Sequence, residues 1–264
     1  MDSKEKQELL DYYWGNEPVY HPTEGIPMPR RTVWKIRFLA MVLLGSYVVF
    51  TAAIVMASPP MPVISWLIGA LAGGFCADLL SGLTHMYIDF GTSNRKNPIH
   101  KELFLSRVHH HELHRPAKLN YASLWFSPAL SSFIVLGLIP AFLGRLLTLP
   151  VNLEMIGPFW LSLLWFSSFS QVAHAYAHGK AKHPVARKVV RSLQKMRLLI
   201  PPKVHGKHHR EIDCNFSVLN GWSNPLLNKI FKKRIEAHVS SNTSPARQKA
   251  DMKQNLSYPY EEIL

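Results

Sequence analysis

The sequence contains 14 histidines, and 13 of them lie at His85 or later. Several form pairs four residues apart, which puts both side chains on one face of a helix, one turn apart. Imidazole is a common ligand of iron, copper and zinc. The pattern therefore indicates a metal site, and its candidate ligands are His85, Asp89, His110, His111, His114, His174, His178, His205, His208 and His209.

Four separate segments carry these residues. In the first, Asp78, Gly82, His85 and Asp89 are spaced four, three and four residues apart, which forms one stripe on a helix. The others are a central His-rich segment, a His174 and His178 pair, and an H-x-x-H-H pattern from His205 to His209. Nine histidines in these segments are too many for one ion, because a structural zinc takes four ligands and a catalytic zinc three. The count favours two metal ions.

The central segment also contains His-Glu-Leu-His at residues 111–114. It is one residue short of the H-E-x-x-H motif of zinc proteases, so a hydrolase is disfavoured. A proton or metal transporter would need ionisable groups deep in its spans, where only Asp78 qualifies. A metal-free, histidine-rich surface is a further alternative, and the repeated helical pairs argue against it.

The elements that must position these residues are apolar helices. Residues 38–77 contain no Asp, Glu, Lys or Arg, and these 40 residues are long enough for two membrane spans. Ser58, Pro59, Pro60 and Pro62 break this run near its middle. Further uncharged runs cover residues 119–144 and 155–173. We predict an all-α integral membrane protein with about four transmembrane helices, at residues 38–57, 63–88, 123–144 and 155–178.

The basic residues predict the topology. They gather before the first span, between the second and third, and after the fourth, so these parts and both termini are expected to be cytosolic. All the candidate ligands then lie at one membrane face. The formal charge of +13 fits a face that contacts anionic lipid headgroups, and no nucleic-acid-binding motif is visible. We expect a polar N-terminal arm (1–33), one membrane domain (34–239) and a polar C-terminal tail (240–264).

The histidine segments resemble the three histidine boxes of the integral-membrane fatty acid desaturases and hydroxylases. They are most similar to the Kua family of lipid desaturases. That family includes plasmanylethanolamine desaturase, the bacterial CarF proteins and the plastid palmitate desaturase. The resemblance covers about residues 77–236 and rests on Ala77–His85 with Asp89, His110-His111, Gln171–Gly179, His205–His209 and Asn215–Trp222.

The resemblance implies a di-iron enzyme that uses O2 and two external electrons to introduce a double bond into a membrane lipid chain. Cytochrome b5 or ferredoxin would supply the electrons, and the membrane would be endoplasmic reticulum, plastid or bacterial inner membrane. The implied catalytic residues are His85, His110, His111, His174, His178, His205, His208 and His209. Asp89 and Asn215 are expected to bind or orient the cofactor, with Asp78 and Gln171 as partners of the ligands.

Two alternatives remain open at this point. A hydroxylase would use the same iron chemistry on the same scaffold. A membrane metal-binding protein without enzymatic activity would also need histidines, but it would not need paired histidines in four segments. The sequence does not choose the headgroup, the chain position or the geometry of the double bond.

Overall fold

The computed structural model describes residues 30–58, 60–91, 121–146, 153–179, 184–211 and 213–242. Within these residues every regular element is a helix and no strand occurs, which confirms the predicted all-α class. Among the described residues, three helices are long and apolar enough to cross a membrane: Val33–Ala57, Val63–Asp89 and Trp125–Leu143. His110, His111 and His114 lie outside the described residues.

The first two spans form a helical hairpin. Helix α2 (Arg30–Ala57) begins at a basic segment and ends where the Ser58 hydroxyl donates to the Ile54 carbonyl at 2.8 Å. Helix α3 (Val63–Met86) begins directly after Pro62 and continues into a π-helical turn, η1 (Tyr87–Gly91). Large apolar side chains on the outer faces of both helices are exposed, as expected for surfaces that contact lipid.

The third span is one continuous run of helix made of three parts, namely α5 (Tyr121–Ser132), the π-helical η3 (Phe133–Leu138) and α6 (Ile139–Leu146). Pro128 lies inside α5, as transmembrane helices permit. Tyr47 of α2 is fully buried against this span, where it packs on Trp125 and Phe133 and its hydroxyl donates to the Ala129 carbonyl at 2.8 Å.

The predicted fourth span, 155–178, is divided into two helices. Helix α7 (Leu153–Ser168) ends at Phe169, where the backbone leaves helical geometry, and α8 (Ser170–Ala177) follows. Phe169 stacks on Trp165 with ring centroids 6.4 Å apart. Because of this break neither helix has the length of a full span, and three rather than four candidate spans result among the described residues.

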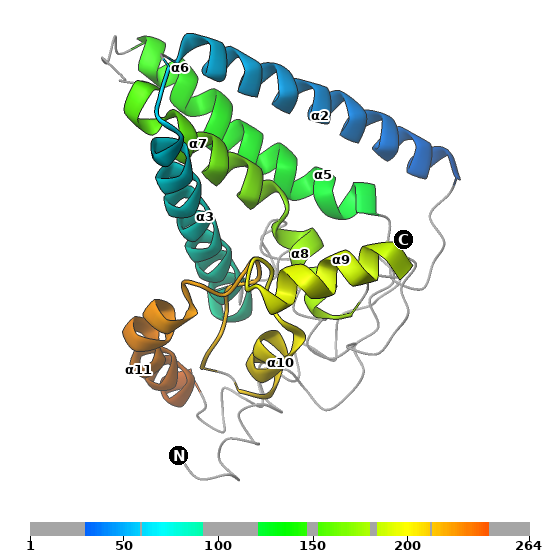
Figure 1. Cartoon of the computed structure of the whole chain (residues 1–264). Coiled ribbons are helices and arrows are strands. Elements are labelled where there is room, and N and C mark those ends of the chain that lie inside the picture. The colour runs from blue at the N-terminus through cyan, green and yellow to red at the C-terminus, as the bar shows by residue number, and fades with distance from the viewer. Residues whose placement is uncertain are drawn as a thin grey trace.

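Contacts between the helices show their relative directions. Gly69, Gly73 and Gly74 of α3 face Pro158, Phe159 and Phe166 of α7 in increasing order, so these two helices run parallel. Helix α2 meets α7 in reverse order, with Ile54 near Gly157 and Thr51 bonded to Trp165. Helices α3 and α7 therefore both run toward the end where the remaining helices gather (Figure 1).

Further helices cover this end of the bundle. They are α9 (Pro184–Lys195), α10 (Pro202–Arg210) and α11 (Asn224–Asn242). A non-helical segment, residues 213–223, connects α10 to α11 and contacts α3. The C-terminal ends of α3 and α8 and the whole of α10 meet here (Figure 1). With the turn η1 that follows α3, they carry the candidate ligands that lie among the described residues.

Candidate metal centre

Three groups of possible metal ligands lie among the described residues: two contain histidines, and the third consists of Glu211, Asp213 and Cys214. His174, His178, His205 and His209 form the four-histidine group, and His85, Asp89 and His208 form the Asp89 group. In each group the ligand atoms all lie within 4.8 Å of one another. The two histidine groups adjoin, because the ring centroids of His85 and His174 are 5.3 Å apart. The structure thus brings together all the predicted histidine ligands that it describes, with Asp89.

In the four-histidine group the Nε2 atoms converge. His174 Nε2 lies 2.9 Å from His205 Nε2 and 3.2 Å from His178 Nε2, and the last two are 3.0 Å apart. His209 Nε2 lies 3.0 Å from His205 Nε2. Two nitrogens bound ~2.1 Å from one ion at right angles would be separated by ~3.0 Å. The separations therefore fit a single metal ion.

The triangle formed by His174, His178 and His205 gives an independent test of that fit. Each neutral Nε2 carries either a proton or a lone pair. With three Nε2 atoms and only these two possibilities, at least two of the atoms must be of the same kind. At least one close pair therefore has two protons, or two lone pairs, facing each other. Three lone pairs directed at one cation remove this repulsion, and the site therefore fits a metal better than a hydrogen-bond network.

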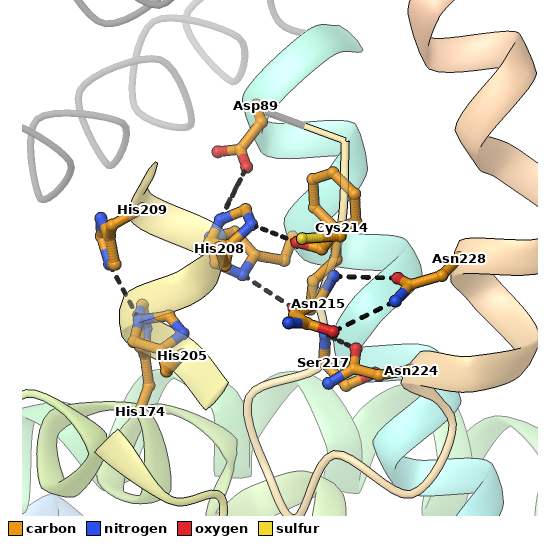
Figure 2. A network of polar contacts seen from close by, with 12 residues as sticks. Asp89, His174, His205, His208, His209, Cys214, Asn215, Ser217, Asn224 and Asn228 are labelled. Atoms are coloured by element: carbon orange, nitrogen blue, oxygen red, sulfur yellow. Dashed lines mark hydrogen bonds and ion pairs between the residues drawn. The ribbon is translucent and has the colours of Figure 1, made fainter. Parts of the chain in front are cut away.

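The Asp89 group is oriented by backbone carbonyls. His85 Nδ1 donates to the Phe216 carbonyl and His208 Nδ1 to the Cys214 carbonyl, both at 2.9 Å, as Figure 2 shows for His208. A carbonyl only accepts, so Nδ1 carries the proton and a neutral ring turns its Nε2 lone pair toward Asp89. Nε2 of His85 and of His208 lie 3.7 and 3.4 Å from Asp89 Oδ2. Two imidazoles and a carboxylate facing one point also fit a metal cation.

Helix geometry explains how α10 supplies both groups. Successive residues on an α-helix point about 100° apart. His205 and His209, four residues apart, share one face and enter the four-histidine group, whereas His208 turns toward Asp89. The adjacent pair His208-His209 therefore connects the two groups (Figure 2).

Burial keeps His205 in the form that binds a metal. Asp89, His205 and His208 are almost fully buried. Burial, followed by repulsion from His174 and His209, lowers the pKa of His205 well below its usual value. The imidazole is then neutral at pH 7 and offers a lone pair without first losing a proton.

Asn215 and Asp78, which are predicted to support the ligands, form hydrogen bonds with residues outside the two histidine groups. The Asn215 side chain bonds to Asn228, and its backbone N–H donates to Asn228 Oδ1 at 2.9 Å (Figure 2). Asp78 is buried against residues 220–223, and the Gln171 side chain is exposed. The carbonyls of Cys214 and Phe216 were not predicted from the sequence, because a backbone acceptor leaves no side-chain signal.

The fold and the site define an all-helical membrane protein with two adjoining groups of possible metal ligands at one end of its helices. The sequence model of the lipid desaturase domain family matches residues 74–249, which is more than half of the chain. The chain belongs to this family. No solved structure matches it.

Proposed function

We propose that this protein is a di-iron desaturase that introduces a carbon–carbon double bond into the acyl or alkyl chain of a membrane glycerophospholipid. The convergence of two adjoining imidazole groups, in a member of the lipid desaturase family, is the observation that supports it. Within that family we place the chain in the Kua branch, on the residues that carry the resemblance.

Imidazoles with one carboxylate are suitable ligands for iron. The four-histidine group would hold one ion and the Asp89 group the other, with His110, His111 and His114 as further proposed ligands. The two ions would supply the activation of O2. The overall change removes one hydrogen from each of two adjacent carbons and, with O2, two electrons and two protons, yields an alkene and two waters.

The protein's own residues would bind the metal ions, orient the ligand rings and shield the site from water. The carbonyls of Phe216 and Cys214 hold the rings of His85 and His208, and burial excludes water from them. The apolar helix α3 carries His85 of the site, so a lipid chain can approach the site along this helix from the bilayer. The sequence shows no flavin or haem motif, and we therefore propose a separate electron donor such as cytochrome b5 or ferredoxin.

Helix α9 is the proposed contact with anionic lipid headgroups. Val185 and Val189 are exposed on it and lie one turn apart, next to exposed Lys188, Arg191 and Lys195. Apolar residues beside cations are typical of helices that lie at a membrane surface. This position would keep the lipid headgroup near the basic face of the protein.

The test combines metal analysis with lipid analysis. The protein is expressed without a histidine tag, and bound metals are measured after purification in detergent. We expect about two iron ions per chain and, in the producing cells, a new lipid double bond that requires O2. His174→Ala should lower product at least about 100-fold while the protein stays in the membrane.

The matched control is Lys207→Ala, on the exposed side of the ligand-bearing α10. It should retain iron and product. Product formation by His174→Ala at the wild-type rate would overturn the metal assignment. A folded wild-type protein without metal would overturn the enzymatic proposal and favour a different role.

A further inference from the structure

A fully buried carboxylate on the membrane helix α3 faces the segment 213–223. Asp78 Oδ1 accepts from the backbone N–H groups of Asn220 and Gly221, at 3.0 and 3.1 Å. Its Oδ2 accepts from the backbone N–H and the hydroxyl of Ser223, at 2.9 and 2.8 Å. Hydrogen bonds to a charged group are about twice as strong as neutral ones. Asp78 therefore fixes three residues of this segment to α3.

The next turn of α3 adds to this attachment. The Ser81 hydroxyl accepts from the Val218 N–H at 3.2 Å. At Gly82 the segment comes so close that a Cβ atom would lie 2.6 Å from Ser217 Oγ and would also overlap Leu227. Asp78, Ser81 and Gly82 thus form a docking surface for residues 217–223, one or two turns before His85 on the same helix.

The segment 213–223 also holds two of the proposed metal ligands. Its residues Cys214 and Phe216 provide the carbonyls that accept from His208 and His85. Each histidine ring can place its Nε2 atom toward Asp89 only while its carbonyl partner stays in position. The contacts therefore form one connected series of hydrogen bonds that leads from Asp78, through the segment 213–223, to two ligands of the Asp89 group.

We propose that Asp78 is a positioning residue: by anchoring the segment 213–223 to α3, it fixes the ring orientation of His85 and His208. This inference rests on the proposed metal centre and specifies how one of its two groups is held. It assigns Asp78 no contact with the metal or the substrate. The four-histidine group, whose Nε2 contacts run between α8 and α10, should depend on Asp78 less.

The test compares Asp78→Ala and Asp78→Asn with Leu80→Ala, a change at an exposed residue of the same helix. Full-length, metal-free protein in detergent is titrated with Co²⁺, and the absorption spectrum reports each bound ion. His85→Ala and His174→Ala serve as references for loss of one group. Hydrogen exchange is measured at the amides of Asn220, Gly221 and Ser223.

We expect exchange at these amides to become about tenfold faster in Asp78→Ala. Its Co²⁺ capacity and spectrum should match those of His85→Ala. Asp78→Asn keeps one acceptor oxygen, so its effects should be smaller, and Leu80→Ala should behave as wild type. If Asp78→Ala does not fold, Asp78→Asn alone decides the comparison.

Wild-type Co²⁺ binding by both Asp78 variants, with faster exchange, would show that the anchor is structural only and would overturn the inference. A spectrum matching His174→Ala would also overturn it. If the wild-type protein itself binds no metal, the proposed function fails instead, so the two failures are distinguishable.

Discussion

Single residues of α10 show how a short motif divides between two sites. His208 and His209 are adjacent in sequence, yet they belong to different ligand groups because a helix turns about 100° per residue. The H-x-x-H-H spacing requires that His205 share a face with a later histidine, and the structure identifies that partner as His209. The position of His208 beside Asp89 depends on the carbonyl of Cys214, which the spacing does not reveal.

Cys214 is predicted to be an unreactive thiol. It is buried, and burial together with the nearby Glu211 and Asp213 raises the pKa of Cys214 to about 12. Relative to the ordinary value of 9.0, the thiolate fraction at pH 8 falls by about 1,000-fold. Iodoacetamide should therefore modify Cys214 at least about 100-fold more slowly in the native protein than in the unfolded chain. Peptide mass spectrometry measures both rates, and equal rates would contradict the burial of this residue.

At the scale of elements, the contact between α3 and α7 depends on glycines. A Cβ atom at Gly73 would overlap the Phe159 carbonyl and lie 2.8 Å from Ser162 Cβ, both on α7. Gly73→Val should separate the two helices and lower the free energy of unfolding by about 1–3 kcal/mol. Thermal unfolding in detergent measures the change. Gly45→Ala, where nothing lies within 4 Å of the new Cβ, is the control and should have little effect. Equal melting temperatures for Gly73→Val and wild type would contradict this packing.

The sequence predicts the elements better than the contacts between them. Uncharged runs reveal the apolar helices because each charge in a membrane is costly, and helical spacing pairs His174 with His178 and His205 with His209. The interruption at Phe169 gives no such signal, since no glycine or proline stands there and aromatic packing against Trp125 and Trp165 accompanies it. The partners of Asp78 are equally hidden, because they lie more than 140 residues away along the chain.

For the whole molecule, the helix directions bear on the topology. Three spans alone would leave the termini on opposite sides of the membrane. Helix α7, although short, runs antiparallel to α2 and parallel to α3, toward the ligand-bearing end. A crossing by α7 would make the number of crossings even. This supports the proposal that the regions before α2 and after α8 share one face, which the basic residues indicate as cytosolic.

Labelling of single introduced cysteines tests this topology. Pro60 is exposed between α2 and α3, and Arg191 is exposed on α9, so each can carry a cysteine without disturbing the core. In sealed vesicles with the cytosolic face outward, an impermeant maleimide should modify Arg191→Cys directly and Pro60→Cys only after permeabilisation. The wild-type chain corrects for Cys76 and Cys214. Labelling of both positions from one side would show an even number of crossings between them, so α3, the third span and α7 would not all cross as proposed.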